Sequence, residues 1–453
     1  MQTRQAVRSE IFETMSVPRL FWACVLPGSV SMAAGALYVV VDGMFVGHYM
    51  GSESLAAANM MWPLLGVVFA LASMIGAGSS VQIAKYLGMH ERHQASRTFS
   101  SSVALTLCLG VLMCVAGFLL TDPFLKLLGA SEHTAALSSV YIRSYLLSGP
   151  LVCLYYAVNS YLRVCGLQKL SMWLNVFTSL LNLVLDYIFI VILREGIWCA
   201  SFTTCVSLSL GAVIGMAPFV AGKTDLRLIK GFIPFSQLKR MLANGVPEFL
   251  EEVSVSFLML IVNAALLRLG GTAAVAANAA VLYIGSVVMM MLDGMTNAMQ
   301  PALSYCYGAR LYGRVGQIAK WLLHSSAVFA VCACAVMELW GPFFISLYAQ
   351  AGDDEFVRLG VLCIRLFSLS YLFIWAEITL RVFLTALESP GRAFVLSMCR
   401  SIVFPLGSLA LCASVWGLEG IWGSAAVAAL LSALLGARFA RALWRSLNAP
   451  SRA

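Results

Sequence analysis

The sequence predicts an all-α integral membrane protein with twelve transmembrane helices, arranged as two six-helix bundles in parallel repeat. Three observations support this fold class. The 453-residue chain is 60% hydrophobic and only 11% charged, with a mean hydropathy of +0.87, so it has too little polar surface to cover a soluble globule. Its apolar residues form long continuous runs. Its two halves also share a sequence pattern.

The apolar runs are long enough for helices that cross a bilayer, which needs about 20 residues. In chain order they cover 18–42, 54–83, 95–121, 135–161, 170–193, 196–221, 238–267, 273–304, 316–340, 356–385, 393–416 and 418–444. Strands of a membrane barrel would alternate apolar and polar residues, whereas these runs stay apolar throughout. The first run follows three arginines, as a secretory signal would, but it is longer than the apolar region of a signal. We therefore expect it to be retained as a helix.

Two pairs of segments match each other without gaps. GSESLAAAN at 51–59 matches GGTAAVAAN at 270–278, and IRSYLLS at 142–148 matches IRLFSLS at 364–370. One such match could arise by chance among helices rich in small residues. Two matches at spacings of 219 and 222 residues indicate a duplication of six helices. Because six is an even number, the two repeats are parallel.

The duplication divides the chain into an N-terminal lobe at 1–221, a cytoplasmic linker at 222–237 and a C-terminal lobe at 238–453. The linker is basic and contains glycine and proline. It also contains the tripeptide GKT, but Ala217 stands where a phosphate-binding loop needs its first glycine. ATP binding is therefore not expected, and the energy for any transport would come from an ion gradient.

The basic residues predict the orientation in the membrane. All but six of the 29 lysines and arginines fall on the side of the N-terminus, and those six are Lys126, Arg143, Arg194, Arg268, Arg358 and Arg365. The positive-inside rule then places both termini in the cytoplasm, and we expect the cytoplasmic membrane of a bacterium or archaeon. The net charge of +8 needs no nucleic-acid partner, because the bases are spread over separate segments.

Acidic residues within or near the predicted spans are the main functional candidates, because a charge at mid-depth costs at least about 2.5 to 3.5 kcal/mol. They are Asp42, Asp186, Glu248, Glu251, Glu252, Asp293 and Glu377. Asn175, Asn182 and Asp186 follow at spacings of seven and four, on one face of the helix 170–193. Tyr38 shares a face with Asp42, four residues later. Such a group could coordinate sodium or hold a proton, although polar residues of this kind can also simply join helices.

The helix 196–221 adds two hydroxyl groups, Thr203 and Thr204. Glu248 and Glu252 lie four residues apart in the helix 238–267, on one face of its first turns. A binding role and a structural role are equally open for these two acids, because a carboxylate near a helix N-terminus is favourable by itself.

For Asp293 and Glu377 a structural role is favoured, through pairing with bases such as Arg381. The sequence contains no pattern that predicts a cofactor or a structural metal. The thirteen cysteines lack the paired spacing of a zinc site, and HERH at 90–93 is typical of a solvated turn. No nucleophile motif such as G-x-S-x-G occurs, so an enzyme is not expected.

Several motifs resemble those of the multidrug and toxic-compound extrusion (MATE) family. They are VDGMFVGHYMG at 41–51, LAAANMMWP at 55–63, YLG at 86–88, LNLVLDYIF at 181–189 and QPALSYCYGA at 300–309. The likeness covers nearly the whole chain, and it implies two six-helix bundles that export compounds in exchange for ions. By this resemblance Asp42 is the acid of helix one, Asn182 and Asp186 are the pair of helix five, and Thr204 is the hydroxyl of helix six. Asn159 resembles a further polar lining residue.

The C-terminal lobe departs from the family pattern. Members with a second carboxylate site carry a glutamate deeper in helix seven and an aspartate in helix ten. Val255 takes the first place here, and Glu377 lies about one turn from the second. The resemblance therefore predicts an ion site in the N-terminal lobe and leaves one in the C-terminal lobe open.

The sequence as a whole predicts a monomeric antiporter in membrane lipid. It would export small organic cations or other amphipathic compounds in exchange for H⁺ or Na⁺ as the coupling ion. The alternative is a flippase for lipid-linked oligosaccharides or other lipids, which should line its cavity with many bases. An intramembrane enzyme would need a nucleophile and a base, or metal ligands, that the sequence does not show.

Overall fold

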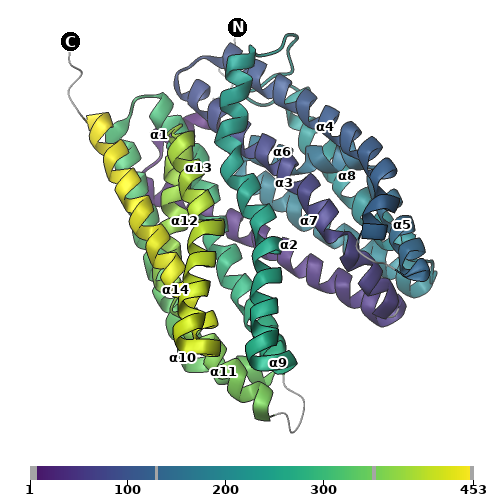
Figure 1. Cartoon of the computed structure of the whole chain (residues 1–453). Helices are drawn as coiled ribbons and strands as arrows, with labels where there is room; N and C mark the ends of the chain where they lie inside the picture. The colour runs from purple at the N-terminus through teal and green to yellow at the C-terminus, as the bar shows by residue number, and fades with distance from the viewer. Residues whose placement is uncertain (1–7, 51, 128–130, 349–353, 449–453) are drawn as a thin grey trace. The chain divides into compact units, whose positions relative to one another are not determined.

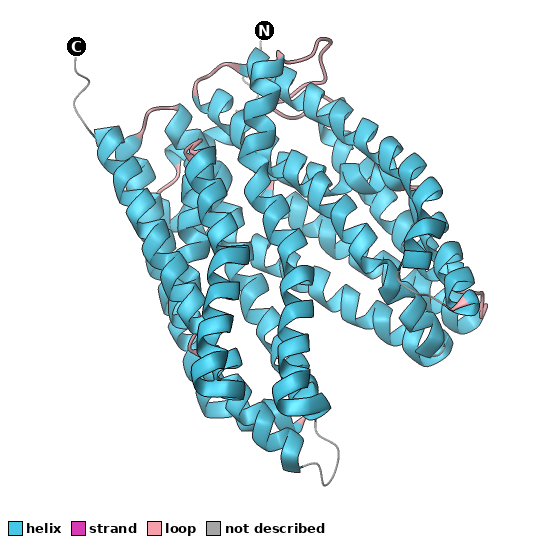
Figure 2. Ribbon diagram, viewed as in Figure 1, coloured by secondary structure: helices cyan, strands magenta, loops and turns pink. Residues whose placement is uncertain are grey.

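The computed structural model describes residues 8–50, 52–127, 131–348 and 354–448. Every regular element within these ranges is a helix, as Figure 2 shows. A helix satisfies its own backbone hydrogen bonds, which is what a chain surrounded by hydrocarbon requires. The predicted all-α membrane class is confirmed.

Each predicted apolar run has a helical counterpart (Figure 1). The first half contains η1 (Arg8–Glu10), α1 (Ile11–Thr14), α2 (Val17–Met50), α3 (Ser52–Gly88), α4 (Arg92–Leu127), α5 (Glu132–Leu146), α6 (Gly149–Val164), α7 (Gln168–Asp186), the π-helical turn η2 (Tyr187–Ile192) and α8 (Trp198–Val220). The second half contains α9 (Phe235–Gly308), α10 (Tyr312–Ser346), α11 (Asp354–Ser368), α12 (Tyr371–Ala386), α13 (Pro390–Met398), the π-helical turn η3 (Cys399–Val403) and α14 (Phe404–Asn448).

Two of these helices join two predicted runs at a glycine: α9 contains both of its runs, and α14 contains the end of one run and the whole of the next. The backbone of α9 turns at Gly271, with φ 65°, and that of α14 turns at Gly417, with φ 58°. Positive φ favours glycine, because any Cβ would be strained there. Both glycines lie between predicted runs, so the sequence separates the four helices correctly.

Two other predicted runs are broken in the structure. The run 135–161 becomes α5 and α6, which meet at 60°, and the run 356–385 becomes α11 and α12, which meet at 45°. Each break comes at the end of the matched segments IRSYLLS and IRLFSLS, 222 residues apart. The sequence predicts single helices here, and the structure corrects this in the same way in both halves. The duplication thus extends to a local bend.

By length and composition, eight helices of the described chain are candidate membrane spans, or ten if each bent pair counts as one span. Two of them, α9 and the helix that ends in α14, each hold two predicted runs around a glycine turn. Counting those runs separately gives the twelve spans that the sequence predicts.

The chain divides into two compact units by its internal contacts. Unit 1 comprises Met1–Met15 and Leu26–Phe249, and unit 2 comprises Ser16–Val25 and Leu250–Ala453. The predicted linker 222–237 falls within unit 1, where backbone N–H groups of residues 227, 229 and 233 donate to the hydroxyls of Ser96, Ser100 and Ser101 on α4 at 2.9–3.2 Å. The lobe boundaries at 221 and 238 stay a prediction.

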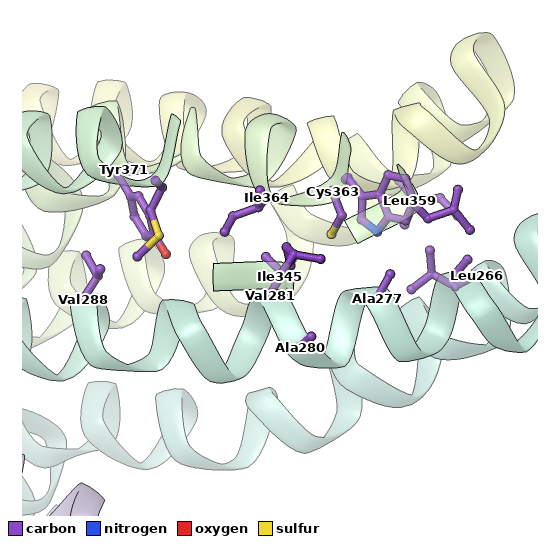
Figure 3. Packing of buried hydrophobic residues seen from close by; sticks show 14 of the residues in the cluster. Leu266, Ala277, Ala280, Val281, Val288, Ile345, Leu359, Cys363, Ile364 and Tyr371 are labelled. Carbon is purple, nitrogen blue, oxygen red and sulfur yellow. The ribbon is translucent and has the colours of Figure 1, made fainter. Parts of the chain in front are cut away.

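The core of unit 2 forms between α9 and the bent pair α11–α12. Figure 3 shows Val281 and Val288 of α9 facing Ile364 and Tyr371. These side chains are almost fully buried, as the apolar stripe of each helix requires. In unit 1 the corresponding packing joins α3, α4, α6 and α8. The polar residues described next lie mainly on α2, α5, α6, α7 and α8.

Candidate functional site

Two carboxyl groups meet inside unit 1. Asp42 lies on α2, and Asp186 is the last residue of α7, directly before the π-helical turn η2. Asp186 is fully buried, and the two side chains lie within hydrogen-bonding reach of each other. The buried Oδ1 of Asp42 accepts no hydrogen bond from the residues that the structure describes. Two carboxylates this close repel each other, so the contact requires a shared proton or a cation between them.

Asp186 is held by two neighbours. Thr203 of α8 donates from Oγ1 to Asp186 Oδ1. Asn182, one turn earlier on α7, donates from its amide to Asp186 Oδ2 at 2.9 Å when the amide is oriented to suit both of its neighbours. In that orientation the Asn182 oxygen accepts from Thr204 Oγ1 at 3.3 Å. The structure thus brings together Asp42, Asn182, Asp186 and Thr204, the four residues predicted to bind the coupling ion.

Aromatic side chains surround this group. The Tyr38 hydroxyl lies within hydrogen-bonding reach of Thr204, and Tyr141 of α5 lies near both carboxyl groups. Tyr145 and Tyr156 lie near Tyr38, and the ring of Phe69 is 5.9 Å and 5.1 Å from theirs, respectively. Tyrosine faces attract organic cations, and two carboxyl groups beside them reinforce that preference.

Asn159 and Asn175 belong to a second polar cluster, between α6 and α7. Asn175 donates to Asn159 Oδ1 at 2.8 Å, and Ser171 donates to the same oxygen at 2.9 Å. Tyr155 donates to Asn175 Oδ1 at 2.7 Å. These side chains satisfy one another, so they fix the packing of two helices. No hydrogen bond in the described structure connects this cluster to Asp42 or Asp186.

The acids of the seventh predicted helix separate in the structure. Glu252 is exposed, and Glu248 is partly buried in unit 1 near Arg163. The acid between them in sequence, Glu251, is instead the centre of an ion-pair cluster in unit 2. Glu251 pairs with Arg381 at 2.8 Å and with Arg400 at 2.5 Å.

Two further acids join this cluster. Asp293 lies 3.8 Å from Arg381, which confirms the predicted partner. Glu377 pairs with a different base, Arg400, at 2.6 Å. The positive-inside count also assigned Arg381 and Arg400 to the cytoplasmic side, whereas both are mostly buried beside carboxylates. Their charges are neutralised within unit 2.

Sequence reasoning did not assign several of these contacts. It named Thr203 beside Thr204, but the contact of Thr203 with Asp186 depends on helix rotation, which two adjacent threonines do not reveal. Tyr141 carried no signal beyond an aromatic residue in a span. Arg400 is 149 residues from Glu251, and its position on the π-helical turn η3 alters the face that a regular helix would give it.

A duplicated, multi-pass helical fold with a buried carboxyl pair beside tyrosines defines a membrane transporter. The sequence profile of the MatE family matches residues 27–188 and 247–409, once in each half of the chain. The chain therefore belongs to the MatE family, the multidrug and toxic-compound extrusion family.

Individual relatives are distant in sequence but similar along their whole length. The chain is 23% identical over 427 residues to the multidrug export protein MepA of Staphylococcus aureus strain MSSA476, covering 93% of each. It is 22% identical over 428 residues to MepA of Staphylococcus haemolyticus, covering 94% of this chain and 93% of that protein.

Solved structures share the fold. A MATE protein in complex with MaL6 superimposes with a TM-score of 0.92 at 22% identity, covering 99% of this chain and 100% of that one. An outward-facing multidrug resistance MATE family transporter gives 0.91 at 21% identity, with the same coverage. A transporter of the MOP superfamily from Pyrococcus furiosus also gives 0.91 at 21% identity, again with the same coverage.

Proposed function

We propose that this protein is an antiporter that exports organic cations or other amphipathic compounds in exchange for H⁺ or Na⁺. The carboxyl pair of Asp42 and Asp186 carries the proposal. No lysine, arginine or histidine among the described residues pairs with either of them, so their charge must be balanced by an ion from outside the protein. Binding and release of such an ion would couple export to the ion gradient.

The tyrosines beside the pair support organic cations as substrates. The export of multiple drugs by the MepA relatives points to the same class. We place the protein in a bacterial cytoplasmic membrane as a monomer with both termini in the cytoplasm, without a cofactor and without catalytic activity.

A flippase for lipid-linked oligosaccharides is less well supported. Such a protein should present free bases to an anionic headgroup. The two arginines buried in unit 2, Arg381 and Arg400, are both paired with carboxylates.

The proposal is tested by Asp42→Asn, which keeps the size of the side chain and removes its titratable charge. We expect this variant to insert and fold normally but to lose export of a fluorescent organic cation from vesicles under an imposed proton or sodium gradient. Wild-type export by the folded variant would refute the proposed site.

A further inference from the structure

Unit 2 contains a second buried carboxyl pair, and its surroundings differ from those of Asp42 and Asp186. Arg400 of η3 lies between Glu251 of α9 and Glu377 of α12, at 2.5 Å and 2.6 Å. Arg381 of α12 contacts Glu251 at 2.8 Å. The four side chains are only 1–19% exposed, so water screens these contacts weakly.

The four charges balance without an added ion. A guanidinium group does not release its proton in a protein, so Arg381 and Arg400 are permanent cations. They match the two carboxylates, Glu251 and Glu377. The fifth charged residue, Asp293, contacts Arg381 from 3.8 Å, and its side chain is 26% exposed, more than any of the four. Its charge is the most accessible to water, and it is not counted in the quartet formed by Glu251, Glu377, Arg381 and Arg400.

The charge of the carboxyl pair is therefore balanced differently in the two units. In unit 1 the carboxyl pair has hydroxyl and amide donors, but no base among the described residues. In unit 2 a base is supplied by the chain itself. Both pairs are buried, and only the first needs a proton or a metal cation from solution.

We infer that Arg400 is a built-in cation that occupies the carboxyl pair of Glu251 and Glu377 and keeps it from binding an exchangeable H⁺ or Na⁺. The inference rests on the proposed antiport and deepens it, because it assigns every exchanged ion to Asp42 and Asp186. Arg400 acts only through the two carboxylates that it holds, so it is a positioning residue. Its effect is on the number of ions that the protein exchanges.

The local structure explains why an arginine reaches both acids. Arg400 is the second residue of the π-helical turn η3, which follows α13 and precedes α14. A π turn contains one residue more than an α-helical turn, so it rotates the side chains within it relative to a regular helix. This position lets a single guanidinium contact residues from two other helices.

The inference is tested by counting titrating carboxyl groups through infrared difference spectra of purified protein between about pH 5 and pH 9. The background carries Asp42→Asn, which removes the exchange expected in unit 1. In this background Arg400→Gln leaves one arginine for two buried carboxylates, so we expect one additional titrating carboxyl per chain. Adding Glu377→Gln should abolish the new signal, and Arg400→Lys should never produce it, because lysine retains the charge.

Absence of a new signal in folded Arg400→Gln protein would overturn the inference. If that variant does not fold, a protein that retains Arg400 still decides the question. In the Asp42→Asn background, Glu377→Gln should leave the carboxyl signal unchanged, and loss of a titrating group would show that unit 2 exchanges a proton despite Arg400. None of these measurements depends on transport, so an error in the proposed antiport would appear separately, as export that ignores Asp42.

Discussion

The two aspartates of unit 1 differ in how well they are provided with hydrogen-bond donors. Asp186 receives one donor on each oxygen, from Thr203 and Asn182. Asp42 has a buried oxygen that none of the described donors reaches. An exchangeable proton therefore fits best on Asp42, from which it can be donated to Asp186. In this arrangement Asp186 accepts the hydrogen bond, and Asp42 is the residue that gains and loses the proton.

We predict that Thr203→Val destabilises the protein by about 1–3 kcal/mol, because the buried Asp186 carboxylate loses a hydrogen-bond donor. Valine has nearly the same size as threonine, so packing changes little. The loss should be smaller in acid, where a protonated Asp186 needs fewer donors. Thermal unfolding in detergent at two pH values measures both effects. Thr121→Val is the matched control, because the buried Thr121 hydroxyl donates only to a backbone carbonyl of its own helix. Equal losses in the two variants would contradict the role given to Thr203.

Within unit 1, glycines allow α3 to pack closely against the first turns of α9. A Cβ added at Gly245 would overlap the backbone carbonyl of Met74, and one added at Gly78 would overlap that of Met241. Small residues at such crossings allow backbones to pack directly, which is the main attraction between helices in a membrane.

Gly245→Ala should therefore destabilise the protein by about 1–3 kcal/mol, because neither backbone can move away without disturbing its helix. Gly66→Ala is the matched control on α3, since a Cβ there meets nothing within 4 Å. That change should be neutral or slightly stabilising, because alanine favours a helix by about 0.5–1 kcal/mol. Thermal unfolding of both variants in one detergent provides the comparison. Similar stability would show that α3 and α9 are not packed this closely.

The first transmembrane helix, α2, contains Pro27 in its interior. The assignment of α2 to the two units also changes here, between Val25 and Leu26. Proline removes one helical hydrogen bond and allows a bend at this point. A helix that bends here could follow changes of charge at Asp42, which lies about four turns further along.

We predict that Pro27→Ala slows turnover more than it weakens substrate binding, because the restored hydrogen bond stiffens the helix. Initial export rates in vesicles and binding of a fluorescent substrate to purified protein separate the two effects. Pro123→Ala is the control, because Pro123 lies within α4, which belongs entirely to unit 1. A change in affinity at unaltered turnover would argue against a hinge at Pro27.

The elements show what sequence periodicity can and cannot predict. The breaks at Gly271 and Gly417 were predictable, because a glycine lies between the two flanking apolar runs in each case. The bend between α5 and α6 had a signal in Gly149 and Pro150, but the equivalent bend after Ser368 has no proline or glycine. Apolar composition continues across both bends. Hydropathy reports only this composition and gives no information on the direction of the helix axis.

The candidate site was predictable where residues share one helix or one motif. Asn182 and Asp186 are four residues apart, and Asp42 stood out as an acid in a predicted span. The family resemblance then linked Thr204 to the same site. The quartet of unit 2 was not predictable. Spacing of four favoured Glu248 and Glu252 over Glu251, and the pairing of Glu251 with Arg400 depends on the three-dimensional arrangement of α9 and η3. Long-range ion pairs leave no periodic pattern in a single sequence.

For the whole molecule, the duplication is symmetric in fold and asymmetric in charge. Both halves share the bent helix pair and the family match. One unit places an unbalanced carboxyl pair among hydroxyl and amide groups, and the other places a balanced quartet. A protein with a single unbalanced pair should exchange one cation at a time, and the identity of that cation depends on what the pair can coordinate.

The pair can accept either a proton or a sodium ion, and we expect the two to compete. Sodium needs several oxygen ligands, and the two carboxyl groups and Thr204 could supply some of them. Asn182 could supply another if its amide rotates so that its nitrogen donates to Thr204 and its oxygen faces Asp186. A proton needs only one carboxyl group. Because bound sodium must be displaced before a proton can bind, sodium should shift the pH dependence of export toward lower pH.

Export of a fluorescent cation from vesicles, measured across pH with and without sodium, tests this competition. Asn182→Ala should weaken the sodium effect, because it removes one oxygen ligand, while proton-driven export partly survives. Asn175→Ala is the control, since Asn175 belongs to the separate cluster with Asn159 and should leave the sodium effect intact. A pH profile that sodium does not move would exclude a shared site. The unbalanced pair would then exchange protons alone, since a proton satisfies two adjacent carboxylates without the ligand shell that sodium requires.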